Sequence, residues 1–361
     1  MRFPEFSGEW VETELQDIVP NICSGKDRIS NSGEVALYGS TGVIGRTNSA
    51  SYKENIVLVA RVGANAGQMQ IGNAPCGVTD NTLVIDAKEW NYYIYYFLQH
   101  YNLNRLVFGS GQPLITGGML KRIKVRYGCK AERNNITRLL CLIDERIATQ
   151  NKIIEKLQSL IKGLSQQLLS SENDWILYRL DDLAQIKSGY SGTQVSYQTP
   201  YKVSRIETIS KHCIDIQRIG YVECIPESYR LNVGNILFSN INSIQYIGNT
   251  AYLDKDYGLY HGMNLLRIIP NTTIVRPRFL HLLLCTDWAI NHFQTICNKA
   301  VSQASINQTA LGKSRFPIPP MSVQQQICSM FELTERKLDN EQEYISCLQQ
   351  QKRYLLQKMF I

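Results

Sequence analysis

The sequence lacks the marks of a membrane-spanning or secreted protein. Its longest apolar stretches, such as Phe279 to Cys285, fall far short of the roughly 20 residues that cross a bilayer. Its N-terminus, Met1 to Glu5, has no apolar core of a secretory signal. Its 10 cysteines include no Cys-x-x-Cys pair, which favours reduced thiols over a disulfide framework or a zinc site. We therefore expect a cytoplasmic protein with no membrane partner; a secreted protein with several disulfide bridges is the alternative.

Recognised catalytic motifs are also lacking. The segment Gly39 to Gly45 is glycine-rich but is not G-x-G-x-x-G, and Gly312-Lys313-Ser314 lacks the first glycine of a phosphate-binding loop. No G-x-S-x-G and no carboxylate cluster of a nuclease occurs. The histidines stand apart from Cys and carboxylate partners at metal-ligand spacing, so we expect them to be packed or at the surface: His100, His212, His261, His281 and His292. The sequence predicts a binding protein with no active site, no cofactor and no metal.

The charge balance permits nucleic-acid binding without proving it. There are 38 Lys and Arg against 31 Asp and Glu, giving a net charge of +7 and a pI near 8.8. Hydrophobic content of 44% and charged content of 19% are ordinary for a soluble folded protein. A chain of 361 residues suffices for two or three domains, each with its own core.

The chain repeats itself. Each half opens with Trp-x4-Leu-x-Asp, which begins at Trp10 in the first half and at Trp175 in the second. A Ser-Gly pair follows each opening, as Ser24-Gly25 and Ser188-Gly189. A loop recurs after a shift of 191 residues, with the pairs Gln112 and Gln303, and Ile115 and Ile306. Duplication of one unit predicts a molecule with near two-fold symmetry, suited to a target with two similar parts.

Each half closes with a heptad run. The core positions of the first run are Ile136, Leu140, Ile143, Ile147, Gln150, Ile154, Leu157, Ile161, Leu164 and Leu168. The same shift of 191 gives Ile327, Phe331, Thr334, Leu338, Glu341, Ile345, Leu348, Lys352, Leu355 and Met359. A strict 3.5-residue repeat predicts a left-handed coiled-coil seam. From Ile136 to Leu168 the helix would extend about 50 Å.

These patterns predict an α+β fold with two pseudo-repeated globular domains, residues 1–130 and 171–318. Two long coiled-coil helices, 131–170 and 319–361, would join them as an antiparallel pair, with one domain at each end. In the first domain we expect strands at 55–60, at 82–85 and near 123–125, and a helix at 90–105. In the second we expect a strand at 235–238 and a helix at 277–293.

Two polar residues occupy equivalent core positions of the heptads. Gln150 and Glu341 would approach each other in an antiparallel pair, and a buried polar contact there would fix the helix register. A solvated gap, or a docking point for a partner chain, is the alternative.

Several motifs, in order and over essentially the whole chain, resemble a known family. They are Phe3-Pro4-Glu5-Phe6 with the Trp10 opening, Tyr38-Gly39-x-x-Gly42-x-Ile44-Gly45, Ser110-Gly-Gln-Pro113, and Pro317-x-Pro319-Pro320-x-x-x-Gln324-x-x-Ile327. Together they resemble the specificity (S, or HsdS) subunit of type I restriction-modification systems. Ser322 and Val323 stand where that family commonly has acids, and the stretch Gly128 to Glu132 has lost both prolines.

The resemblance implies a DNA-reading scaffold. Each globular part would be a target recognition domain that reads one half of a bipartite double-stranded DNA target. The helices would act as a spacer and dock two modification (M) subunits, which bind S-adenosylmethionine and methylate adenine. Restriction (R) subunits would then join to translocate and cut DNA, so ATP and Mg are expected on partner subunits only. A rod of about 50 Å corresponds to roughly 15 base pairs.

Residues that read bases or bind phosphates need paired donors and acceptors or a positive charge. Candidates in the first domain are Lys26, Arg28, Tyr38, Ser40, Thr41, Arg46, Arg61, Asn65, Gln68, Ser110 and Gln112. Those in the second are Lys187, Ser188, Tyr190, Lys202, Ser204, Arg205, Asn240, Asn242, Lys299, Ser302 and Gln303. For each, the alternative is a solvated surface residue or a turn former.

The sequence is also consistent with two other functions. One is a coiled-coil interaction scaffold that recruits other chains without reading a DNA sequence. The other is a carbohydrate- or nucleotide-modifying enzyme whose motifs are not recognised.

Overall fold

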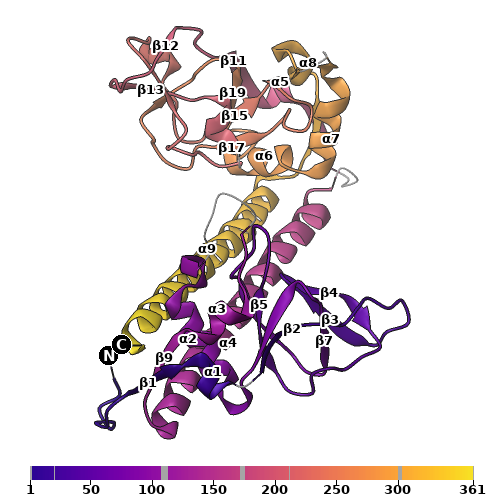
Figure 1. Ribbon diagram of the computed structural model, residues 1–361. Coiled ribbons are helices and arrows are strands. Elements are labelled where there is room, and N and C mark those ends of the chain that lie inside the picture. Colours follow the sequence, from indigo (N-terminus) through magenta and orange to yellow (C-terminus); the bar gives the residue numbers. More distant parts are fainter. Residues whose placement is uncertain are drawn as a thin grey trace. The chain divides into compact units, whose positions relative to one another are not determined.

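Two compact units make up the chain. The computed structural model describes residues 2–19, 21–106, 113–170, 175–210, 212–299 and 303–360. One unit comprises Met1–Ile153 with Glu341–Ile361, and the other comprises Ile154–Asn340. The division falls within each of the two long helices, α4 (Lys130–Leu168) and α9 (Met321–Met359) (Figure 1). Within the described ranges, none of the helices combines the length and apolar character needed to cross a membrane.

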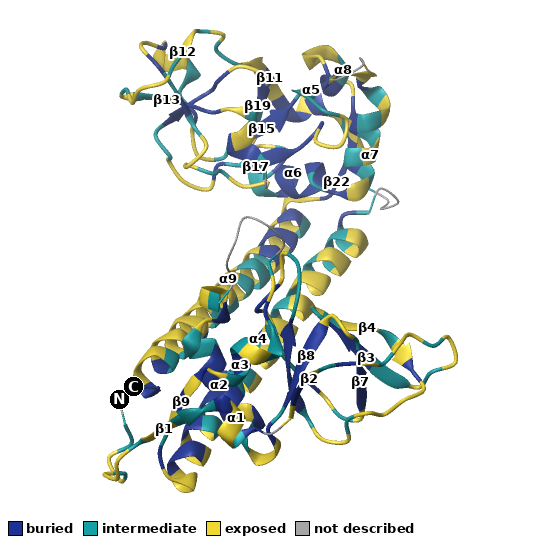
Figure 2. Ribbon diagram, viewed as in Figure 1, coloured by how far each residue is buried: buried dark blue, intermediate teal, exposed yellow. Residues whose placement is uncertain are grey.

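The first unit is built on a four-stranded antiparallel sheet. Its strand order is β2 (Asn21–Ser24), β8 (Thr82–Asp86), β5 (Ile56–Ala60) and β6 (Met69–Gly72). All five residues of β5 are buried, as the apolar run in the sequence predicts (Figure 2). Helix α2 (Asn91–Tyr101) packs its apolar side into the same core, through residues such as Tyr93, Ile94 and Phe97.

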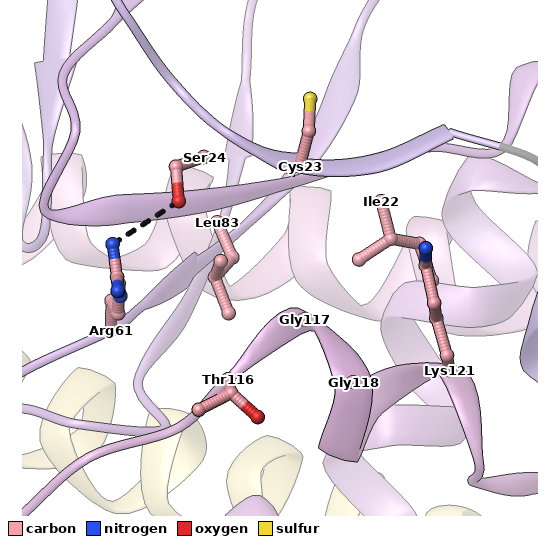
Figure 3. A pocket seen from close by; sticks show the side chains of 9 residues that line it. All are labelled: Ile22, Cys23, Ser24, Arg61, Leu83, Thr116, Gly117, Gly118 and Lys121. Atoms are coloured by element: carbon pink, nitrogen blue, oxygen red, sulfur yellow. Dashed lines mark hydrogen bonds between the residues drawn. The ribbon is translucent and has the colours of Figure 1, made fainter.

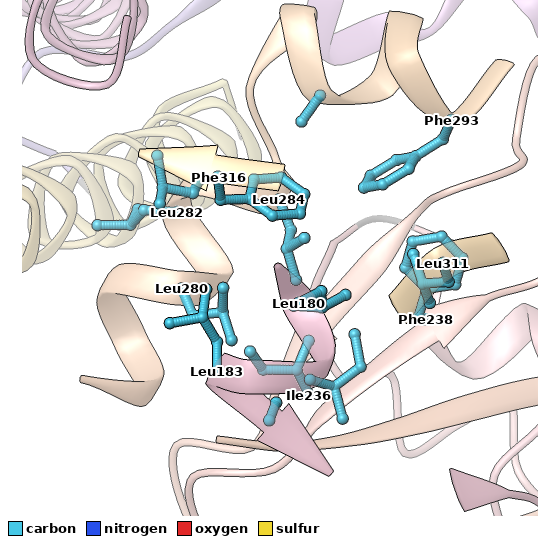
Figure 4. Packing of buried hydrophobic residues seen from close by; sticks show 14 of the residues in the cluster. Leu180, Leu183, Ile236, Phe238, Leu280, Leu282, Leu284, Phe293, Leu311 and Phe316 are labelled. Atoms are coloured by element: carbon cyan, nitrogen blue, oxygen red, sulfur yellow. The ribbon is translucent and has the colours of Figure 1, made fainter. Parts of the chain in front are cut away.

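The second unit repeats this sheet. Its order is β11 (Ala184–Ser188), β19 (Leu265–Pro270), β15 (Ile236–Ser239) and β17 (Thr250–Tyr252), again antiparallel throughout. Side chains from helices α5 (Leu180–Leu183), α6 (Pro277–Leu284) and α7 (Asp287–Ile296) meet those of β15 in the core (Figure 4). The rings of Phe238 and Phe293 pack edge to face there, with centroids 5.0 Å apart.

The remaining elements complete the two units. In the first they are β1 (Val11–Glu14), α1 (Leu15–Ile18), β3 (Val35–Gly39), β4 (Gly42–Thr47), β7 (Cys76–Val78), α3 (Gly117–Lys121) and β9 (Lys124–Tyr127). In the second they are β10 (Ile176–Arg179), α5 (Leu180–Leu183), β12 (Gln194–Val195), β13 (Tyr201–Val203), β14 (Gly220–Val222), β16 (Ile241–Asn242), β18 (Leu259–Tyr260), α6 (Pro277–Leu284), α7 (Asp287–Ile296), β20 (Asn298–Lys299), β21 (Ala304–Ser305), α8 (Gln308–Gly312) and β22 (Arg315–Ile318).

Matching backbone hydrogen bonds within each unit identify equivalent positions in the two repeats. The amide of Ile115 donates to the carbonyl of Arg61 at 2.8 Å, and the amide of Ile306 donates to that of Asn240 at 2.9 Å. The strand pairings agree, because Ile22 faces Ile85 across the sheet where Ile186 faces Ile268. The predicted duplication is confirmed, and Arg61 and Asn240 are equivalent positions.

Two helix predictions were wrong in extent. The helix expected at 277–293 is two helices, α6 and α7, separated at Cys285 and Thr286. Thr286 caps the second helix, since its hydroxyl accepts a hydrogen bond from the Ala289 amide at 3.3 Å. The helix expected at 90–105 ends at Tyr101, because Asn102 adopts the left-handed conformation with φ 61°.

The heptad prediction is confirmed along both long helices. Each helix has 39 residues, or about 58 Å at 1.5 Å per residue. Every predicted heptad core position is buried or half-buried. The helices begin at Lys130 and Met321, close to the expected starts at 131 and 319.

Within the first unit the two helices are antiparallel. Gln150 donates its side-chain amide to the Glu341 carboxylate, which confirms the predicted contact between them. Farther along α9, Lys352 forms an ion pair with Asp144 at 2.7 Å. Residue numbers therefore fall along α4 as they rise along α9, as in an antiparallel pair. The ion pair also explains a lysine in a heptad core position. The role of Gln150 and Glu341 in fixing the register stays a prediction.

The repeated Ser-Gly pair has a steric cause. A Cβ atom on Gly25 would lie 2.2 Å from the carbonyl oxygen of Val78. A Cβ atom on Gly189 would lie 1.8 Å from the carbonyl oxygen of Gly262. Only glycine allows the chain to pass so close to a neighbouring backbone. The motif therefore marks the same close approach in both units.

We expect Gly25→Ala and Gly189→Ala each to lower the free energy of unfolding by ~1–3 kcal/mol, because the backbone must move away from the new methyl group. Gly163→Ala is the control. Gly163 lies exposed within α4 with nothing near its Cβ position, so alanine there should raise stability by ~0.5–1 kcal/mol. Denaturant titration measures all three, and unchanged stability in the first two would exclude the steric explanation.

Candidate nucleic-acid interface

A loop in the first unit exposes two cations on either side of an anchored carboxylate. Lys26 and Arg28 are both exposed. Between them, Asp27 accepts a hydrogen bond from the Val78 amide at 2.8 Å. Its other oxygen accepts from the hydroxyls of Ser49 and Ser51. The anchored Asp27 fixes this loop, so that the two positive charges face solvent at a defined place.

The β3–β4 hairpin carries further candidates, which differ in how far their side chains are exposed. Arg46 is exposed, and one of its Nη atoms donates to the Glu34 carbonyl at 2.7 Å. Thr41 is exposed at the turn, while the Ser40 hydroxyl donates to the Asn81 carbonyl. Tyr38 is only 8% exposed and packs in a core cluster. Its burial gives Tyr38 a structural role and removes it from the surface candidates.

The next group of candidates follows the end of strand β5. Arg61 is half-buried, and its Nη1 atom donates to the Ser24 hydroxyl at 3.4 Å (Figure 3). Beyond it, Asn65 and Gln68 are exposed and bonded to each other at 3.1 Å, which braces the turn between β5 and β6.

In the second unit, His261 and Gly262 anchor the segments that carry the candidates. The Tyr190 amide donates to the His261 carbonyl at 3.0 Å, and the Gly262 amide donates to the Ser204 hydroxyl at 3.0 Å. Ser204 is fully buried, so it acts as an anchor rather than a surface contact. The anchored segments leave four side chains exposed: Lys187, Ser188, Lys202 and Arg205.

The later candidates of this unit divide between surface and interior. Lys299 and Gln303 are exposed, next to β20 and β21. Asn242 uses its side-chain amide internally, donating to the Ser239 hydroxyl at 3.1 Å. The Nδ2 atom of Asn240 donates to the Ile306 carbonyl at a long 3.4 Å, and its buried Oδ1 atom has no partner among the residues that the structure describes. Tyr190 packs on Tyr229, with ring centroids 5.3 Å apart.

Three candidates, Ser110, Gln112 and Ser302, lie outside the described residues. Among the others, the structure exposes Lys26 and Arg28 on a loop of the first unit, and it exposes Lys187 and Lys202 on strands β11 and β13 of the second. Sequence reasoning missed the anchors Asp27, His261 and Gly262. Only Asp27 gave a signal, as an acid between two basic residues.

Two histidines lie close to the Cys285 sulfur, and the Nδ1 atom of one of them, His212, is 4.0 Å from it. His281 and Cys285 are one helical turn apart, and Nε2 of the histidine lies 3.4 Å from the sulfur. Burial lowers the pKa of His281 to about 3 and raises the pKa of Cys285 to about 11. Both are therefore uncharged at neutral pH. Across the described ranges, no group of three or more His, Cys, Asp or Glu is placed to hold a metal ion.

The family model for the type I restriction modification DNA specificity domain matches residues 7–169 and again residues 172–350. The chain therefore belongs to this family and carries its domain twice.

Two relatives from Methanocaldococcus jannaschii support the assignment. The putative type I restriction enzyme MjaX specificity subunit is 38% identical over 193 residues, which span 52% of this chain and 45% of the relative. Slightly under half of that protein's length is therefore matched. The type I restriction enzyme MjaVIII specificity subunit is 23% identical over 311 residues, covering 75% of this chain and 70% of the relative.

Solved structures share the fold. The S subunit of a type I restriction-modification system from M. genitalium superposes with a TM-score of 0.68 at 16% identity, covering 98% of this chain and 96% of the other. A chain from a structure of complex assembly and conformational transition of the type I R-M system gives a TM-score of 0.59 at 13% identity, covering 100% and 98%. Both confirm the predicted two-domain α+β architecture with long helices.

Acidification should weaken the anchor at His261. Burial lowers the pKa of this histidine from 6.5 to about 4. Below pH 6.5 the unfolded chain therefore takes up a proton that the folded chain excludes until about pH 4. We expect this group to lower the free energy of unfolding by about 2 kcal/mol between pH 7 and pH 5. Denaturant titrations at both pH values measure the loss, which His261→Gln should reduce. An equal pH dependence in the variant would show that His261 does not contribute.

Proposed function

We propose that this chain is the DNA-reading subunit of a type I restriction-modification complex. Each unit reads one half of a bipartite duplex target, and the paired long helices set the distance between the halves. The observation that carries the proposal is the repeated sheet, with the same closing hydrogen bonds in both units. Loops and strand ends in each unit expose lysine and arginine, the residues that bind DNA phosphates.

The helices suit a spacer of fixed length. A helix of 39 residues extends about 58 Å, or roughly 17 base pairs of duplex. If the units lie at opposite ends of the helix pair, they would meet half-sites between one and two turns apart. A rigid spacer fixes the gap because changing it would require breaking the apolar seam.

The helices also offer surface to partner subunits. Large apolar side chains remain exposed on them: Leu142, Ile153, Leu160, Met330, Leu333, Tyr344 and Tyr354. An apolar side chain that protrudes from a helix is removed from water when a partner chain packs over it. We propose that two M subunits dock there and carry S-adenosylmethionine and the methyl-transfer chemistry. R subunits, with ATP and Mg, join this complex in the cytoplasm, and the present chain supplies no catalytic group.

The same exposed side chains favour the second candidate, an interaction scaffold that does not read DNA. Selection from random duplexes, with the chain bound to its M subunit, separates the two. We expect enrichment of one split sequence with a constant gap. Binding that depends on salt but enriches no sequence would exclude the reading function and favour the scaffold.

A pair of variants tests the exposed loop in the same assay. Arg28→Ala should weaken DNA binding and reduce the slope of log K against log salt by about one if Arg28 contacts a phosphate. Lys255→Ala removes an equal charge from an exposed position between β17 and β18, away from both long helices, and should leave that slope unchanged. Equal effects of the two variants would assign the binding to overall charge instead of the loop.

A further inference from the structure

A small pocket opens in the first unit where β2, β5 and α3 meet. Its volume is about 260 Å³, and Ser24, Arg61, Thr116, Gly117 and Lys121 are among the residues that line it. Figure 3 shows the Arg61 and Lys121 side chains on opposite sides of the view, with Gly117 between them. No carboxylate is among the described residues of its lining. The pocket is therefore a positively charged concavity.

The positive charges of the pocket have few partners. The only hydrogen bond of the Arg61 guanidinium to a described residue is the long one of 3.4 Å to Ser24. Its Nε atom is buried and has no hydrogen-bond partner among the described residues. Lys121 is half-buried and forms no ion pair with another described residue. The guanidinium and ammonium groups that line the pocket thus have few acceptors among the described residues, and an anionic ligand would supply them.

Two hydroxyls in the lining can donate as well. The Thr116 hydroxyl accepts a hydrogen bond from the Met119 amide, and the Ser24 hydroxyl accepts from Arg61. Neither hydroxyl donates to another described residue, so each proton can be donated to a ligand. The pocket thus offers a guanidinium, an ammonium and two hydroxyls, all of them donors.

The second unit fills the same place with protein. The shift of 191 residues makes Gln308 the counterpart of Gly117. The Gln308 amide donates to the Ile186 carbonyl at 2.7 Å, and Ile186 is the counterpart of Ile22 in the pocket lining. In the first unit, Gly117 has no side chain that could occupy the equivalent position.

The cations are also specific to the first unit. Asn240 stands at the position equivalent to Arg61, and Gly312 at the position equivalent to Lys121. One unit therefore combines an open place with two cations, while its repeat has neither. A shared fold does not require this difference, which points to a ligand taken by the first unit alone.

We propose that this pocket binds an oxyanion of the phosphate class. An arginine fork forms paired, charge-assisted hydrogen bonds to phosphate oxygens, and lysine adds a second positive charge. Resting on the proposed function, the oxyanion in the DNA complex is a backbone phosphate beside the half-site read by the first unit. The second unit then holds its half-site without this contact.

Gly117→Gln tests the pocket by giving it the side chain found in the repeat. A Cβ atom on Gly117 would have no neighbour closer than the Ile22 carbonyl oxygen at 3.7 Å, so the substitution fits. The new amide can donate to that oxygen as Gln308 does to Ile186. Gln308→Gly is the matched control, because it opens the equivalent place where no cation lines it. Lys121→Ala is a second variant that leaves the backbone unaltered.

Two measurements are made on each protein. The first titrates the full chain with inorganic phosphate and follows the NMR signal of the Arg61 Nε–H group. The second measures the slope of log K against log salt for duplex DNA, with the M subunit bound. We expect a saturable shift in the unaltered chain that Gly117→Gln abolishes and Lys121→Ala weakens. The slope should fall by about one in both variants, and Gln308→Gly should change neither readout.

The outcomes separate the sources of the anion. A saturable phosphate shift with an unchanged salt slope would support the oxyanion site but overturn its assignment to a DNA phosphate. The absence of both effects would overturn the proposal. If the unaltered chain binds duplexes without sequence preference, the proposed function fails, and the phosphate titration still decides whether the pocket is an oxyanion site.

Discussion

The apolar seam between α4 and α9 is the constraint on which the first unit depends. Its core is closed by Leu355, Met359 and Phe360, which lie more than 200 residues away from most of their neighbours in sequence. The Phe360 ring packs against Tyr93 and Phe97 of α2, with centroids 5.4 and 5.8 Å away. The first unit therefore cannot complete its core until the end of the chain has returned to it, which makes a long-range contact a condition of its stability.

On this frame the two units differ where recognition would occur. The sheets, the closing hydrogen bonds and the Ser-Gly close approach are shared, and each is fixed by backbone geometry. The side chains at equivalent positions around these sheets are not shared, as Arg61 and Asn240, or Gly117 and Gln308, show. A duplicated frame with divergent side chains suits the proposed reading of two unlike half-sites, because rigid elements would position the loops that set specificity.

The sequence predicted what depends on periodicity and repetition. The heptads gave both long helices, and the strand at Ile56 to Ala60 followed from an unbroken apolar run. It missed the break at Thr286 because apolar residues continue on both sides of it. It also placed Tyr38 and Ser204 at the surface, since polar loop residues reveal burial only once their tertiary partners are known. For the same reason, the pocket beside Arg61 needed coordinates, although the Gly117 and Gln308 difference is visible in the repeat alignment.

Hydrogen exchange in Phe360→Ala tests the central claim most directly. Removing this ring takes away a buried contact from α2 (Asn91–Tyr101), and a loss of about 3–5 kcal/mol is expected for such a truncation. Amide exchange in α2 should accelerate strongly, while exchange in α6 (Pro277–Leu284) of the second unit stays as in the unaltered chain. Unchanged protection of α2 would contradict the account, because the first unit would then hold its core without the returning helix.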